Sequence, residues 1–292
     1  MVQKIIQIPH INDGPQDFAT LFNIWSQVNG CHQNVRFDFS RCGFLRPNAV
    51  AFLGGLARLI ECRNGRAEFD WDTLRNQAVK NNLRQNGFAG QFGYPSSGWD
   101  GNSIPYREDI KFQPDDVAEY LSENWIGKGW LHVCEGLKNA IVERILELYV
   151  NAFEHSKTPI GVFSCGQYFK QLNQLQLAMV DFGVGIPANV RGYMKRIRPD
   201  LSAEKLKAAD CLKWAFQRMT TTRPGKSSGG VGLDLLKSFI RRNNGALMVY
   251  GNDGYAVITA KQETYHSFYS AFEGTICLIS LTCDEAFYCL TH

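Results

Sequence analysis

The sequence has 292 residues, 45% hydrophobic and 20% charged, a balance typical of globular proteins that excludes a fibrous repeat and wholesale disorder. With 31 Lys+Arg against 28 Asp+Glu, the formal charge of +3 excludes a generally basic protein, so nucleic acid is not an expected partner. At about 150 residues per domain the length suggests two domains. The longest apolar stretch, residues 49–60, is well short of the ~20 residues that span a bilayer, so no membrane association is predicted.

The N-terminal residues lack the continuous apolar core of a signal peptide. The nine cysteines form an odd set without a CxxC pair, which favours neither a zinc ribbon nor a disulfide framework. We therefore predict reduced thiols and a cytoplasmic location.

Short strand-like runs alternate with amphipathic helical runs in the first ninety residues, which favours a small α/β layer. Strands are predicted over residues 4–8, 34–38 and 67–71. Helices are predicted over 18–28, 48–62 and 72–86, the last of which is expected to begin with Asp72 as its N-cap. Residues 89–106 are rich in Gly, Ser, Pro and Asn and show neither period, so a linker is placed at 96–106. The predicted units are 1–95, 107–285 and a tail at 286–292.

The second unit is predicted to mix helices and strands as well, which makes the whole chain α/β (α+β) in class. The predicted helices cover residues 114–124, 133–155 and 233–242. The predicted strands cover residues 161–165, 176–181, 246–251, 256–261 and 274–282.

Three segments of the second unit carry candidate chemistry. The first, ELYVNAFEHS, spans residues 147–156 of the long helix and places Glu147 and Asn151 four residues apart, on one helix face. A carboxylate can deprotonate water and an amide oxygen can bind Mg²⁺. By itself, however, the pair fits an ordinary polar stripe on an amphipathic helix better.

In the second segment, QLAMVDFGVGIP, an apolar strand ends at Asp181 and is followed by Gly183 and Gly185. The glycines permit a tight turn and close approach of the backbone to a ligand. A buried aspartate needs hydrogen-bond donors, which an exocyclic amine such as that of adenine supplies. A turn with a helix-capping aspartate fits the same residues.

The third segment, SSGGVGLDLL, is a glycine-rich loop that opens into a helix, and N–H groups at a helix N-terminus bind phosphate. A Walker A loop is not favoured, because Thr220 stands where its first glycine is required and no apolar strand precedes the loop. The dinucleotide pattern GxGxxG also fails, because Ala188 replaces its third glycine.

In this order and spacing, the three segments resemble the N, G1 and G2 boxes of the GHKL superfamily, which includes DNA gyrase, heat-shock chaperones, histidine kinases and mismatch-repair ATPases. The resemblance covers about residues 107–285 and implies an α/β sandwich of the Bergerat type. It implies that Asn151 holds Mg²⁺ and that Asp181 binds the adenine amine with support from Thr275. It implies that Gly183 and Gly185 allow the backbone to pass close to the base and the ribose. It also implies that the phosphates meet backbone N–H groups of Gly230, Gly232 and Leu233.

Two departures bear on the chemistry. Asp234 stands where the third glycine of the G2 box is usual. Two readings stay open: the extra carboxylate weakens nucleotide binding, or it points to solvent. Glu147 stands four residues before the box asparagine, as in the ATPases and the anti-sigma-type serine kinases, and is therefore the candidate general base. The resemblance thus implies Mg²⁺-dependent ATP hydrolysis, with a serine/threonine kinase or a non-hydrolysing ATP-binding switch as alternatives.

The region between residues 187 and 229 corresponds to the ATP lid of the family. From Arg191 to Arg242 there are thirteen Lys+Arg against four Asp+Glu, an excess of nine positive charges. A solvated basic helix face accounts for such an excess, but Lys226, or Arg223, is also a candidate ligand of the γ-phosphate.

The first unit, through residues 34–60, resembles the core of STAS domains, the anti-sigma-antagonist fold. Where those antagonists carry a phospho-acceptor serine, this chain has Arg46, Pro47 and Asn48. The resemblance therefore implies docking or regulation, with a protein partner and with homodimerisation left open. An ATPase fused to an adaptor-like domain is consistent with bacterial signalling or conflict systems.

Overall fold

The computed structural model describes residues 3–98, 101–198, 202–217 and 231–290. Its first sheet is parallel and has the strand order β1-β2-β3. Its strands are β1 (Gln3–Gln7), β2 (Asn34–Asp38) and β3 (Arg66–Asp70). They are connected by α1 (Pro15–Val28) and α2 (Pro47–Cys62), each of which begins with a proline, whose fixed φ suits the first turn of a helix. The sheet is followed by α3 (Gln77–Gln85) and α4 (Phe88–Gln91).

The second sheet is antiparallel, with the order β4-β5-β6-β8-β7. Its strands are β4 (Ser103–Asp109), β5 (Val162–Phe169), β6 (Gln174–Asp181), β7 (Ala246–Thr259) and β8 (Glu263–Thr282). The helices of this part are α5 (Pro114–Glu119), α6 (Glu135–His155), α7 (Ile186–Ile197), α8 (Ala208–Ala215) and α9 (Val231–Arg242). Short 3-10 or π turns lie at Trp71–Thr73, Tyr120–Trp125, Ile126–Lys128, Lys170–Leu172 and Ala203–Lys205.

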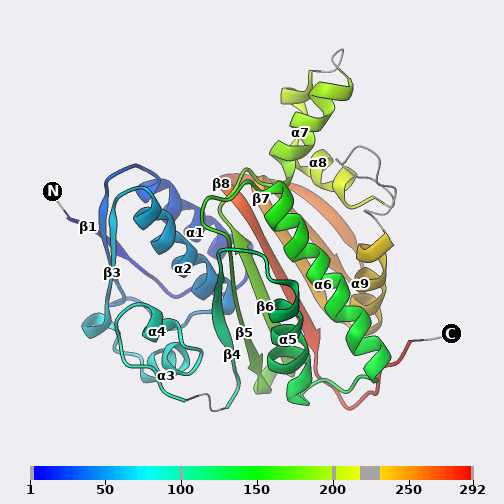
Figure 1. The fold of residues 1–292 in the computed structure, drawn as a ribbon, viewed down its shortest axis with the longest axis horizontal. Coiled ribbons are helices and arrows are strands. Elements are labelled where there is room, and N and C mark those ends of the chain that lie inside the picture. The colour runs from blue at the N-terminus through cyan, green and yellow to red at the C-terminus, as the bar shows by residue number, and fades with distance from the viewer. Residues whose placement is uncertain (1–2, 99–100, 199–201, 218–230, 291–292) are drawn as a thin grey trace.

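Helices cover both faces of the antiparallel sheet (Figure 1). Helices α1 and α2 lie between the two sheets: α2 packs on β3 and also on β5 and β6, while α1 packs on β8. Helices α6 and α9 pack together in the core on the opposite face. Strand β6 is buried along nearly its whole length, which explains its apolar run. The mixed α/β class predicted from the sequence is confirmed.

One hydrophobic core joins the two predicted units. Phe22 of α1 and Phe52 of α2 pack against Phe272 of β8, with ring centroids 5.2 Å apart in both cases. The same cluster includes Val180 of β6. The division at residues 96–106 therefore does not separate two independent cores, and the assignment of the two parts to STAS-like and GHKL-type domains stays a prediction.

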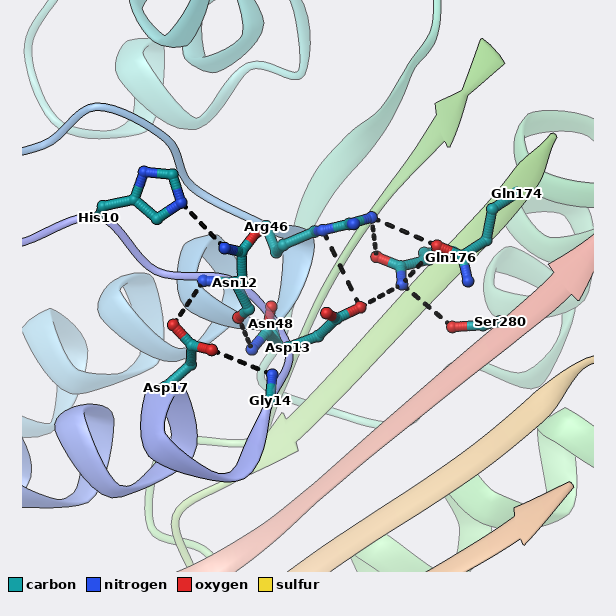
Figure 2. A network of polar contacts seen from close by, with 10 residues as sticks. All are labelled: His10, Asn12, Asp13, Gly14, Asp17, Arg46, Asn48, Gln174, Gln176 and Ser280. Atoms are coloured by element: carbon teal, nitrogen blue, oxygen red, sulfur yellow. Dashed lines mark hydrogen bonds and ion pairs between the residues drawn. The ribbon is translucent and has the colours of Figure 1, made fainter. Parts of the chain in front are cut away.

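A polar network also links the two parts across this contact (Figure 2). The fully buried Gln176 of β6 donates to Asp13 Oδ2 at 2.7 Å and to Ser280 Oγ of β8 at 3.0 Å. Arg46, directly before α2, donates to the Oε1 atoms of Gln174 and Gln176 at 3.3 Å. Arg46 is therefore buried against the antiparallel sheet of this chain.

Several predicted boundaries are wrong. Residues 103–106 of the predicted linker belong to β4, which pairs with β5 despite its proline. The predicted helix 72–86 begins only at α3, where the Asn76 side chain accepts the Val79 N–H and so replaces Asp72 as the cap. The first two of the three predicted terminal strands are one strand, β7, which continues through a register shift at residues 251–254. The third begins earlier than predicted, because β-favouring aromatic residues between 265 and 272 extend β8.

Within the described part of the chain, none of the helices combines the length and the apolar character that crossing a bilayer requires.

Candidate functional site

Asp181 lies at the end of β6 and is 3% exposed. The sheet register places Thr275 of β8 directly opposite it. The Gly183 N–H donates to Asp181 Oδ1 at 2.9 Å, and the hydroxyls of Thr275 and Ser156 and the Thr275 N–H also donate to the carboxyl group. Asp181 and Thr275, both predicted to contact adenine, are therefore neighbours, and protein donors already surround the acid.

Burial raises the pKa of Asp181 to about 7, although the hydrogen bonds from Gly183, Thr275 and Ser156 act in the opposite direction. The cause is the loss of hydration, which disfavours the charged carboxylate more than these donors stabilise it. A carboxyl group that changes charge near neutral pH at a strand end is typical of functional sites, although structural hydrogen-bond networks also produce such shifts.

The loop after Asp181 is held to the end of α6. The Val184 N–H donates to the Ser156 carbonyl at 2.7 Å. A Cβ added at Gly183 would clash with the backbone carbonyl of Ser156, so glycine is required there by the protein's own packing. Gly185 has a φ of 78°, in the left-handed region, and directly precedes α7. The first two predicted segments therefore meet in space.

Asn252 of β7 fixes the same loop from the other side. Its Nδ2 donates to the Val184 carbonyl at 3.0 Å, and its Oδ1 accepts the Ala188 N–H at 3.1 Å. The loop that follows Asp181 is thus held by hydrogen bonds to both α6 and β7. Nothing in the sequence indicates this role, because Asn252 follows the loop by more than sixty residues.

Glu147 and Asn151 both lie on α6, as predicted. Asn151 is exposed, and the Glu147 side chain is 45% exposed. Arg144 Nη1 donates to Glu147 Oε1 at 2.7 Å, so one carboxylate oxygen is held in an ion pair. Arg144 stands three residues before Glu147, a spacing from which this ion pair could have been predicted.

The third segment lies only partly within the described residues. Gly232 and Leu233 belong to the first turn of α9, where backbone N–H groups have no partner inside the helix. Lys226, Arg223 and Gly230 lie outside the described residues. Asp234 is in the first turn of α9, where a carboxylate is favoured by the helix dipole.

Part of the predicted basic excess is neutralised by ion pairs. Arg191 of α7 approaches Asp253 at 3.5 Å, and Lys195 approaches Glu204 at 2.9 Å. Lys237 of α9 is 4% exposed and donates to Glu263 at 2.6 Å. These basic side chains are paired with carboxylates of the same chain. The positive charge counted from the sequence is therefore larger than the charge that remains to bind phosphate.

A magnesium site is compatible with the donor chemistry but not complete in protein ligands. Among the described residues, no group of three His, Cys, Asp or Glu side chains is arranged to hold a metal ion. Mg²⁺ bound with a nucleotide usually keeps several waters and takes its other ligands from phosphates, so one protein oxygen is sufficient. The exposed amide of Asn151 fits that requirement.

Comparison of the sequence with protein-family models finds no match, and comparison with curated proteins finds none.

Proposed function

We propose that the chain binds ATP with Mg²⁺ at the end of β6 and the C-terminal half of α6, with the phosphates directed toward the start of α9, and that it hydrolyses the nucleotide. The observation that carries the proposal is the buried Asp181, which lies opposite Thr275 of β8 and directly precedes a loop that is hydrogen-bonded to the end of α6. An aspartate held in this way can accept a hydrogen bond from an amine N–H, and adenine offers one.

The surrounding donors decide how the base would bind. The N–H groups of Gly183 and Thr275 are fixed by the backbone, whereas the hydroxyls of Ser156 and Thr275 can rotate. We therefore propose that the adenine amine takes the place of one hydroxyl as a donor to Asp181. Gly232 and Leu233 would meet the phosphates through their backbone N–H groups at the start of α9.

Asn151 would hold the Mg²⁺, which neutralises phosphate charge when bound. Glu147, one helical turn earlier on α6, would accept a proton from the attacking water. Because Glu147 Oε1 is paired with Arg144, either that bond opens or the other carboxylate oxygen acts. The ion pair is partly exposed, so opening it costs about 1 kcal/mol or less.

The test is incubation of the purified chain with γ-labelled ATP and Mg²⁺. We expect phosphate release that Glu147→Gln abolishes, and nucleotide binding that Asp181→Asn weakens by about tenfold or more, as expected for loss of a charge-assisted hydrogen bond. Glu143→Gln is the matched control, because Glu143 also contacts Arg144 on α6 but is exposed at 66%.

Three other outcomes would contradict this proposal in different ways. Label transferred to an added protein would indicate a kinase. Binding without turnover in the wild-type chain would indicate a switch. Failure of the wild-type chain to bind ATP would refute the site as a whole.

A further inference from the structure

The C-terminal segment lies against the start of α6. The Cys134 N–H donates to the Tyr288 carbonyl at 2.9 Å, and the Tyr288 N–H donates to the His132 carbonyl at 2.9 Å. These bonds form an isolated parallel bridge between Val133 and Tyr288. Tyr288 is buried against Phe239 of α9, so the segment is packed against both helices.

The next position in this register pairs Cys134 with Cys289. Cys134 has extended backbone angles, φ −73° and ψ 156°, so it continues the strand-like pairing before α6 begins. Neighbouring strands lie about 4.7–4.9 Å apart, within the Cα separation of about 4.4–6.8 Å that a disulfide requires. The two side chains lie next to each other in this pairing, and both residues are free and partly exposed.

The surroundings favour a thiolate on Cys134. Hydrogen bonds from the Cys289 thiol and from the Leu137 N–H at the start of α6 lower the pKa of Cys134. The same thiol contact raises the pKa of Cys289. Arg242 of α9 donates to the Cys289 carbonyl at 3.3 Å, and its positive charge only partly offsets the rise in the pKa of Cys289. Cys134 is thus the more nucleophilic sulfur, with Cys289 next to it.

We propose that Cys134 and Cys289 are a redox modification site at which a peroxide forms a reversible disulfide. The Cys134 thiolate attacks one oxygen of hydrogen peroxide, the O–O bond breaks, and the departing hydroxide takes up a proton to become water. The resulting sulfenic acid is attacked by Cys289, so that the S–S bond forms and the S–O bond breaks with release of a second water. Two thiols and one peroxide thus give one disulfide and two waters.

The disulfide would fasten the C-terminal segment to α6 without touching the proposed nucleotide site. Cys134 precedes Asn151 by 151 − 134 = 17 residues, or about 25 Å along the helix. The closed loop is long, 289 − 134 = 155 residues, so cross-linking restricts the unfolded chain strongly. We expect the thermal midpoint of the oxidised chain to rise by on the order of 5 °C.

The experiment treats the full chain with a small excess of hydrogen peroxide, blocks the remaining thiols with a maleimide and maps the peptides without reduction. We expect one linked peptide pair that contains Cys134 and Cys289, loss of two maleimide labels, and recovery of both labels with dithiothreitol. Cys134→Ser and Cys289→Ser should each abolish the link and the rise in thermal midpoint. Cys62→Ser should retain both, because this exposed thiol lies at the C-terminal end of α2.

The proposal is overturned if the two cysteines are recovered in unlinked peptides, whether unmodified or oxidised separately to sulfinic acid. It is also overturned if the linked pair contains other cysteines. Far-ultraviolet circular dichroism of the reduced serine variants establishes that they are folded. The readout is a covalent link, so the test is independent of whether the chain binds ATP.

Discussion

The buried Asp181 should make the stability of this chain depend on pH in a defined direction. The pKa of Asp181 is about 7 in the folded chain against an ordinary value of 3.8, so the folded state keeps its proton to higher pH than the unfolded state. The free energy of unfolding therefore falls as the pH rises from about 4 to about 7. With about 1.36 kcal/mol per pH unit, this difference corresponds to roughly 4 kcal/mol.

Asp181→Asn removes this dependence, because asparagine does not titrate and its amide oxygen can still accept the Gly183 N–H. We expect the variant and the wild-type chain to be similar in stability near pH 4 and the variant to be more stable by up to roughly 4 kcal/mol near pH 8. Other titrating groups are common to both chains and cancel in the difference.

Urea denaturation of both chains at several pH values measures the difference directly. Asp253→Asn, at an exposed aspartate on β7, controls for the loss of a charge. A difference between wild type and Asp181→Asn that stays constant over this range, or that grows toward acid pH, would show that burial does not set the protonation of this group.

Three further changes test other parts of the structure. Gly183→Ala should lower the free energy of unfolding by about 1–3 kcal/mol, because the added Cβ meets a backbone carbonyl. Gly192→Ala on α7, where the added Cβ would meet no other atom, should be neutral or should stabilise the chain by up to about 1 kcal/mol. Chemical denaturation compares the two variants. Gln176→Leu should destabilise the chain by about 1–3 kcal/mol, because it leaves buried polar partners unpaired, and an unchanged urea midpoint would argue against the network of Figure 2. Arg144→Ala should change the free energy of unfolding by less than about 1 kcal/mol, and it should raise the rate of phosphate release because it frees Glu147 Oε1. A slower rate of phosphate release in a steady-state assay would mean that Arg144 assists the reaction.

Much of the local structure was predictable from the sequence. The strand at residues 34–38 is reproduced residue for residue as β2, and the long helix of the second unit differs from α6 only at its start. Glu147 and Asn151 share that helix because a spacing of four residues is enough to place them on one face. Predicted element boundaries are wrong where two nearby residues could cap the same helix. Asp72 was predicted to begin the helix, but Asn76 caps it instead.

The sequence by itself thus determined most of the helical and extended segments and which of them carry candidate chemistry, because periodicity, capping and turn residues act over a few positions. Only the tertiary structure decided which of these segments meet. It placed Thr275 opposite Asp181, buried that aspartate, joined the two predicted units in one core and brought Cys289 beside Cys134. Strand register and burial depend here on contacts between residues about a hundred or more positions apart, and a sequence pattern over a few residues does not specify such contacts.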